Sequence, residues 1–134
     1  MTLATCANNR VTSRPMSVII YEEKFYCQTD ESFLKYEQIA INPNVALCYK
    51  NYSIEGKCRS IGSPIDENNS FFIERFKKHF ETSCKAYSSL PTEKLLEIKP
   101  NLIYSWQYEL LEPFIEYFDF ENQIYRFDKQ QRVK

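Results

Sequence analysis

Apolar residues near the start of the chain fall into short runs rich in β-branched side chains, separated by polar pairs. Thr2 to Ala7 is the first run, Asn8-Asn9 is typical of a turn, and a longer run extends from Val11 to Tyr21 before Glu22-Glu23. This pattern predicts a β-hairpin. Because Pro15 lacks a backbone N–H, the second strand is expected at a sheet edge or bulged there, with nearby backbone groups free to face a ligand.

The next apolar run predicts a strand followed directly by a helix. Phe25 to Gln28 reads as the strand, and Thr29 or Asp30 is a suitable cap for a helix that reaches about Ile41. Asn42-Pro43-Asn44 ends that helix. The stretch from Gln28 to Lys35 is therefore the corner where a strand becomes a helix.

Along the rest of the chain the apolar residues recur with either helical or strand periodicity. Between Asp66 and Phe80 the apolar residues recur on one helical face, with charged residues on the other. Elsewhere the period is that of strands, with a turn-like segment after the helix. In chain order the predicted elements are a strand pair at Val45–Lys50 and Ser53–Ser60, the helix at Asp66–Phe80, the turn region Cys84–Pro91, a strand at Leu95–Tyr108, and an alternating hairpin at Phe114–Phe127.

Many strands with two helices between them, and no regular βαβ alternation, predict a mainly β, mostly antiparallel barrel with flanking helices. A length of 134 residues, with 43% apolar and 16% aromatic content, suits a single domain covering residues 1–134 with its own core.

The composition limits which binding partners and which cellular compartment we expect for this protein. The 17 basic and 18 acidic residues are dispersed and give a net charge of −1, so the chain has no basic stripe for nucleic acid or an anionic membrane. Five cysteines without a CxxC pair are typical of a reducing compartment. With no signal-peptide pattern at the start and no apolar stretch of the roughly 20 residues that span a membrane, we expect a soluble, cytoplasmic protein.

The corner from Gln28 to Lys35 is the candidate anion site. The chain has only two glycines, which excludes glycine-rich phosphate loops. A helix N-terminus offers free N–H groups, Thr29 and Ser32 add hydroxyls, and Lys35 follows on a neighbouring part of the same face. The alternative is that Thr29, Asp30 and Ser32 only cap the helix and Lys35 is a surface lysine, and the acidic Asp30 and Glu31 weigh toward that alternative.

The histidine, the cysteines and the tryptophan provide no clear candidate for a catalytic or metal-binding residue. His79 is the only histidine and falls on the charged face of the second helix, so histidine-dependent catalysis and multi-histidine metal sites lack their parts. Cys27, Cys48 and Cys58 lie in predicted strands, where a thiol usually acts as a small buried group. Trp106, the only tryptophan, packs either in the core, in an interface, or against a ligand held by a partner subunit. No catalytic side chain and no metal site is predicted.

The order of elements resembles the pyridoxamine 5′-phosphate oxidase-like family of FMN-binding split β-barrels. The resemblance is carried by Arg14-Pro15-Met16-Ser17, the short strand into Thr29, the helix with Ser32 and Lys35, and Asn42 to Leu47, and it extends to Ile54-Glu55-Gly56-Lys57. It implies a six-stranded antiparallel split barrel and a homodimer with two FMN molecules at the interface. The positions that it implies for FMN are Arg14, Met16, Ser17, Val18, Gln28, Thr29, Ser32, Lys35 and, from the partner subunit, Trp106.

This sequence departs from pyridoxamine 5′-phosphate oxidase itself at two places. It has Leu34-Lys35 where that enzyme has an Arg-Lys pair, and its C-terminal segment lacks an Arg-x-His substrate motif. The resemblance therefore implies an FMN-dependent oxidoreductase with an unidentified small-molecule substrate or a nicotinamide nucleotide as partner. The alternatives are a non-catalytic FMN-binding or flavin-storage protein, and a related barrel that binds haem or a deazaflavin.

Overall fold

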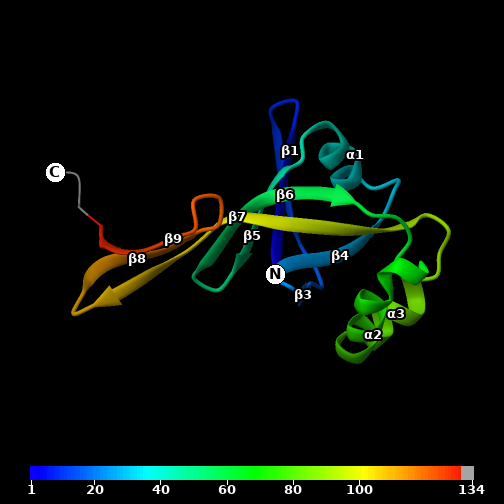
Figure 1. Ribbon diagram of the computed structural model, residues 1–134. Coiled ribbons are helices and arrows are strands. Elements are labelled where there is room, and N and C mark those ends of the chain that lie inside the picture. Colours follow the sequence, from blue (N-terminus) through cyan, green and yellow to red (C-terminus); the bar gives the residue numbers. More distant parts are fainter. Residues whose placement is uncertain (131–134) are drawn as a thin grey trace.

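The computed structural model describes residues 1–130 and shows one continuous antiparallel sheet flanked by helices (Figure 1). The main path of the sheet runs β2-β1-β5-β6-β7-β4-β3, and β8 and β9 extend it from β7. The strands are β1 (Thr2–Ala7), β2 (Arg10–Pro15), β3 (Ile19–Tyr21), β4 (Lys24–Asp30), β5 (Asn44–Tyr49), β6 (Tyr52–Ser60), β7 (Glu93–Glu109), β8 (Glu112–Asp119) and β9 (Ile124–Lys129). The helices are α1 (Leu34–Ile41), a 3₁₀ turn η1 (Glu67–Asn69), α2 (Ser70–His79) and α3 (Glu81–Tyr87).

The predicted fold class, a mainly β barrel with flanking helices, is confirmed. The described sheet has nine strands instead of the expected six. The run from Val11 to Tyr21 accounts for one extra strand, because it is not one strand: it breaks after Pro15 into β2, which pairs with β1, and β3, which pairs with β4. β2 lies at one end of the path, so Pro15 is on an edge strand as predicted.

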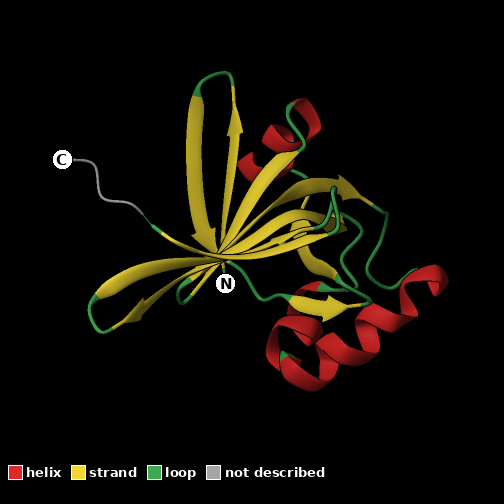
Figure 2. Cartoon of the chain, turned by 60° about the vertical axis from the view of Figure 1, so that its left-hand side comes forward, coloured by secondary structure: helices red, strands yellow, loops and turns green. Residues whose placement is uncertain are grey.

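Alternation along the central strands buries both faces of the sheet. Phe25 and Cys27 of β4 point into the barrel core, where they meet Leu96 of β7, whereas Tyr26 faces the other side. There Tyr26 packs with Phe72 and Phe76 of α2. α1 covers the barrel with Ile39, and α2 and α3 lie together at the other side of the strands (Figure 2).

β7 leaves the barrel at Pro100 and Asn101. Gly56 of β6 pairs with Pro100 and Glu55 pairs with Leu102, so the ladder contains a bulge at this point. A Cβ on Gly56 would lie 2.5 Å from the Lys99 carbonyl oxygen, so only glycine fits this close approach. Beyond the bulge β7 pairs with β8, and β7, β8 and β9 form an arm that extends away from the barrel (Figure 1). We use "arm" for residues 102–129.

Three further expectations were wrong. The corner helix begins at Leu34, with Phe33 at its N-cap, and not at Thr29 or Asp30, because the Asp30 carboxylate accepts from Ser32 N and Oγ and forms a local turn instead. Within the region predicted as turns from Cys84 to Pro91, the residues up to Tyr87 belong to α3. Cys48 is exposed, although Cys27 and Cys58 are buried as expected.

The remaining predicted elements agree with the structure to within a few residues. The hairpins β1–β2, β5–β6 and β8–β9 are formed, and α2 is preceded by η1 over the first part of the predicted Asp66–Phe80 helix. His79 is exposed on α2, as predicted. None of the described helices is long and apolar enough to cross a membrane.

Candidate functional site

A cavity of about 350 Å³ opens between the end of β2, the end of β4, the start of α1 and the α3 region. Five of the nine predicted site residues line it: Met16, Ser17, Gln28, Thr29 and Lys35. Apolar and aromatic side chains complete its walls, and a buried carboxyl group lies at its polar end. The additional lining residues are Pro15, Asp30, Phe33, Phe76, Ser83, Tyr87, Leu90 and Glu93, so the Asp30 carboxylate also belongs to the wall. We call this space the Lys35 cavity.

Lys35 and Thr29 form the cationic part of the cavity. Lys35 lies in the first turn of α1, and its Nζ donates to Thr29 Oγ1 over 3.0 Å. Thr29 is only 4% exposed, and burial lowers the pKa of the Lys35 ammonium, with the nearby Arg14 guanidinium adding to that effect. Within residues 1–130 Lys35 forms no ion pair; its ammonium also lies 4.8 Å from the centre of the Phe33 ring. The Glu93 and Asp30 carboxyl groups lie near enough to raise the Lys35 pKa against these effects, but neither forms an ion pair with it. A half-buried cation without an ion-pair partner is suited to bind an anion.

Gln28 is held by hydrogen bonds to other parts of the chain. Its Nε2 donates to Glu93 Oε2 over 3.2 Å, and its Oε1 accepts from Ser88 Oγ over 2.7 Å. Both polar ends of the Gln28 amide are therefore occupied by protein groups. The structure makes Gln28 a positioning residue that links β4 to β7 and to the segment after α3.

Glu93 was missed by sequence reasoning. It is 5% exposed at the start of β7, and burial raises the pKa of its carboxyl group, with the neighbouring Asp30 adding to that effect and Lys35 opposing it. Asp30 behaves differently: its carboxylate accepts from Thr92 Oγ1 and from Ser32, and these hydrogen bonds lower its pKa. Asp30 is thus a satisfied turn residue, whereas Glu93 is a buried acid beside Lys35.

The segment between β2 and β3 supplies backbone donors. Met16 is fixed to Met1 by a pair of hydrogen bonds, from Met16 N to Met1 O and from the Met1 amino group to Met16 O. Among the described residues, the N–H groups of Ser17 and Val18 have no hydrogen-bond partner. Free N–H groups beside the cavity can donate to a polar ligand edge.

The other four predicted residues lie outside the lining of this cavity. Arg14 directs its guanidinium to Thr5 Oγ1, Thr12 Oγ1 and the Leu3 carbonyl. Ser32 is exposed and donates to Asp30, and Val18 lines a neighbouring groove. Trp106 lies on the arm, 40% exposed, with its backbone carbonyl accepting from Asn51 Nδ2.

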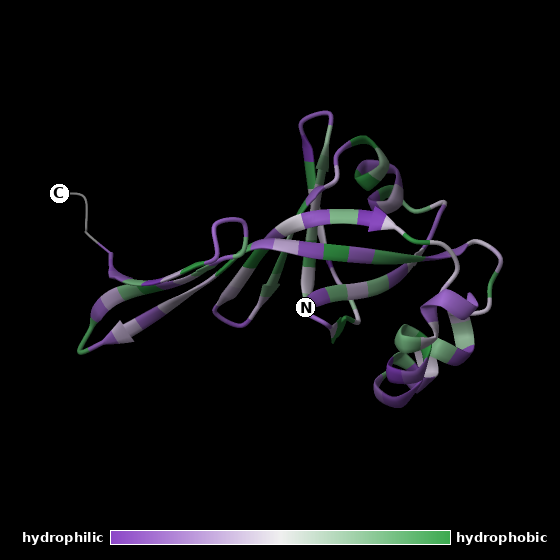
Figure 3. Ribbon diagram, viewed as in Figure 1, coloured by the Kyte–Doolittle hydropathy of each residue, from purple (hydrophilic) through white to green (hydrophobic). Residues whose placement is uncertain are grey.

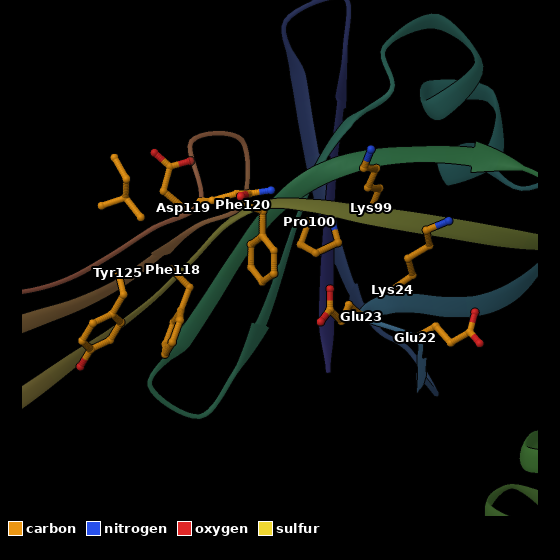
Figure 4. A pocket seen from close by; sticks show the side chains of 11 residues that line it. Glu22, Glu23, Lys24, Lys99, Pro100, Phe118, Asp119, Phe120 and Tyr125 are labelled. Carbon is orange, nitrogen blue, oxygen red and sulfur yellow. The ribbon is translucent and has the colours of Figure 1, made fainter.

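A second depression, of about 490 Å³, lies where the arm joins the barrel, and it contains none of the predicted residues (Figure 4). Phe118, Phe120 and Tyr125 form its apolar wall, and Lys24 and Lys99 stand on the opposite strands. Lys24 is paired with Glu97 at 3.8 Å. The depression lacks a buried unpaired charge, so the Lys35 cavity is the better candidate site.

The family model described as pyridoxamine 5′-phosphate oxidase matches residues 1–107. Comparison with curated protein sequences gives no match.

Three solved structures illustrate the similarity of fold. A pyridoxamine 5′-phosphate oxidase-related, FMN-binding protein from Nostoc punctiforme PCC 73102 has 15% identity and a TM-score of 0.67, with 98% of this chain and 87% of that chain covered. The haem storage protein HutZ from Vibrio cholerae has 15% identity and a TM-score of 0.62, covering 74% and 79%. An FAD-binding protein from Mesorhizobium loti has 12% identity and a TM-score of 0.59, covering 76% and 80%.

Proposed function

The chain belongs to the pyridoxamine 5′-phosphate oxidase family, and from that premise we propose that it is an FMN-binding flavoprotein that works as an oxidoreductase in the cytoplasm. The observation that carries the proposal is the half-buried Lys35 ammonium, which has no ion-pair partner among the described residues and lines a cavity beside the Thr29 hydroxyl. A phosphate group satisfies such a cation by charge-assisted hydrogen bonds.

The donors around the Lys35 cavity fit the two ends of FMN. Lys35 Nζ and Thr29 Oγ1 would hold the phosphate, and the free N–H groups of Ser17 and Val18 would donate to the polar edge of the ring. Phe76 and Tyr87 offer apolar surface in the wall of the same cavity. When bound, a flavin supplies the hydride or electron transfer, and the protein supplies binding, orientation and a shaped pocket.

The position of the only histidine in the sequence favours a flavin over haem as the bound cofactor. Haem iron is commonly held by a histidine. The sole histidine, His79, is exposed on α2 and lines a different groove, so the Lys35 cavity has no imidazole to offer. The haem alternative lacks its usual ligand at this site.

We also propose that the protein is a homodimer with an FMN at each of two equivalent interface sites. Aromatic side chains on the arm are exposed, including Trp106, Tyr108 and Phe127, and a second subunit is a suitable cover for them. Among the described residues the arm pairs with the barrel only through residues 102–105 against β6, and its stacked rings pack on one another across its own strands.

The test is a calorimetric titration of the purified apoprotein with FMN and with riboflavin. It is carried out on the wild type and on Lys35→Ala. Loss of a charge-assisted contact of roughly 1.5–3 kcal/mol should weaken FMN by about 10-fold or more and leave riboflavin almost unchanged. Lys94→Ala is the matched control, because Lys94 pairs with Glu31 and does not line the cavity.

Two outcomes would contradict the proposal. Binding of haem but not FMN, seen in the absorption spectrum, would favour the alternative of a related barrel that binds haem. An equal loss of FMN and riboflavin affinity in Lys35→Ala would show that the cation does not contact the phosphate. Turnover of a reduced nicotinamide nucleotide by the FMN-loaded protein then separates an enzyme from a non-catalytic flavin carrier.

A further inference from the structure

The turn at the far end of the arm consists of two exposed leucines. Leu110 and Leu111 join β7 to β8, with 98% and 87% of their surface exposed. Both have positive φ, 49° and 67°, a conformation that costs a non-glycine residue roughly 1–2 kcal/mol. The positive-φ turns at Asn8-Asn9 and Glu22-Glu23 use polar residues. Leu110-Leu111 therefore adds exposed apolar surface to a strained turn, and the isolated chain gains no packing from it.

Leu110 and Leu111 line none of the five cavities found among the described residues. The arm and the pair α2 and α3 lie at opposite ends of the molecule (Figures 1 and 2), and the tip of the arm is hydrophobic (Figure 3). Two acidic residues, Glu109 and Glu112, flank the leucines. Glu112 pairs with Lys129, whereas Glu109 has no ion pair within residues 1–130. The tip is thus apolar with an unpaired negative charge beside it.

A groove at the opposite end of the molecule combines apolar surface with positive charge, which complements the apolar and acidic tip of the arm. It has a volume of about 690 Å³ and lies between β3 and α2. Val18, Ile20 and Phe80 give it apolar surface, and Arg75, Lys78 and His79 line its α2 side together with Glu74. Ile20 is more than half exposed, and Lys78 forms no ion pair among the described residues. We call this the β3–α2 groove.

We propose that the Leu110-Leu111 turn of one subunit docks into the β3–α2 groove of a second copy of this chain, with Glu109 beside the partner subunit's Lys78. The contact rests on the homodimer proposed above and identifies the surfaces that form it. It buries the two leucines against apolar side chains and pairs two charges that are otherwise unpaired. In a dimer with a twofold axis this contact is made twice, once by the tip of each subunit.

The contact also positions Trp106. Trp106 precedes Leu110 by four residues of an extended strand, about 13 Å along β7. In the partner subunit the β3–α2 groove reaches Val18, two residues after Met16 of the Lys35 cavity. A docked arm therefore carries Trp106 across the partner's groove toward the region of that cavity.

The experiment is to replace both leucines by the pair that this turn type prefers, Leu110→Asn with Leu111→Gly. The change suits the left-handed turn, so the hairpin stays folded while the apolar surface is lost. We expect the dimer dissociation constant, measured by sedimentation equilibrium with FMN present, to rise at least about 100-fold, because four leucine side chains lose their cover. Glu22→Asn with Glu23→Gly is the matched control at another positive-φ turn, and it should leave the dimer unchanged.

A charge exchange tests the docking geometry. Glu109→Lys and Lys78→Glu should each weaken the dimer, and the double variant should recover most of the loss. A dimer that is unaffected by the leucine replacement overturns the docking contact and leaves the FMN proposal standing. A wild-type protein that binds FMN as a 16 kDa monomer overturns both the dimer and the contact.

Discussion

Lys35 and Thr29 approach each other across the loop that connects β4 to α1. Their hydrogen bond of 3.0 Å brings a cation to a threonine that is almost fully buried. Burial disfavours the charged ammonium and lowers its pKa, and an anion bound beside it would offset that cost. Lys35 is therefore the residue on which the proposed phosphate contact most depends.

Replacing Thr29 by valine should show what the Thr29 hydroxyl contributes to FMN binding without disturbing the fold. Thr29→Val keeps the branched shape in β4 but removes an oxygen that faces Lys35 Nζ. We expect FMN affinity to fall by about 1 kcal/mol, or about fivefold, in a calorimetric titration. The affinity for riboflavin should stay the same, and a fall of equal size for riboflavin would contradict a role at the phosphate.

The buried Glu93 carboxyl group lowers the stability of the folded protein by an amount that depends on pH. Burial raises the pKa of the Glu93 carboxyl above its usual 4.5, so the folded protein holds this proton more tightly than the unfolded chain. The resulting destabilisation is fully present above the folded pKa and disappears as the pH falls toward 4.5. Asp30 and Lys35 are the charged neighbours that modify this cost.

We therefore expect Glu93→Gln, which can still accept from Gln28, to be more stable than the wild type at pH 7. The difference in the free energy of unfolding, measured with urea, should shrink as the pH is lowered from 7 toward 4.5. Asp30→Asn is the contrasting variant: its carboxylate has a lowered pKa, so removing that charge should destabilise the protein at pH 7. A stabilisation by Glu93→Gln that grows at low pH would contradict burial as the cause.

At the scale of elements, the bulge opposite Gly56 turns β7 from a barrel strand into the first strand of the arm. A side chain at Gly56 would meet the Lys99 carbonyl oxygen in the backbone of β7 and would force the two strands apart. Gly56→Ala should lower the free energy of unfolding by about 1–3 kcal/mol in urea denaturation. Ser53→Ala, in the same strand, is the control and should cost less than about 1 kcal/mol; equal midpoints for both variants would contradict the close approach.

Most elements could be predicted from the sequence because their signals are local. The hairpin turn at Asn8-Asn9 and the apolar face of α2 are examples, since polar turn residues and helical periodicity report directly on structure. The turn at Leu110-Leu111 could not be predicted, because leucines carry no turn signal. The start of α1 was predicted too early because Asp30 can cap either a helix or a local turn, and the sequence does not distinguish them.

Local sequence pattern predicted only the part of the candidate site whose residues lie close together in the chain. Thr29 and Lys35 share one loop and helix start and were expected at the same site, whereas Met16 and Ser17 were expected there from the family resemblance. Glu93 reaches Gln28 across 65 positions of sequence, through the pairing of β4 with β7, and no local pattern predicts it. The walls from α3 were missed because that helix was read as turns.

At the scale of the whole molecule, the barrel with α2 and α3 and the arm have separate roles in the proposed dimer. The barrel holds the Lys35 cavity at one end, and the arm presents Trp106 and the leucine turn at the other. A site that receives residues from two subunits requires this separation, because one chain cannot bring its own arm to its own cavity.

The measurement that tests the central claim most directly is a crystal structure of the protein with FMN. We expect the phosphate within hydrogen-bond distance, roughly 2.7–3.2 Å, of both Lys35 Nζ and Thr29 Oγ1, with the ring beside the backbone of Ser17 and Val18. A phosphate more than about 6 Å from both side chains, or FMN bound in the depression formed by Phe118 and Tyr125, would contradict it.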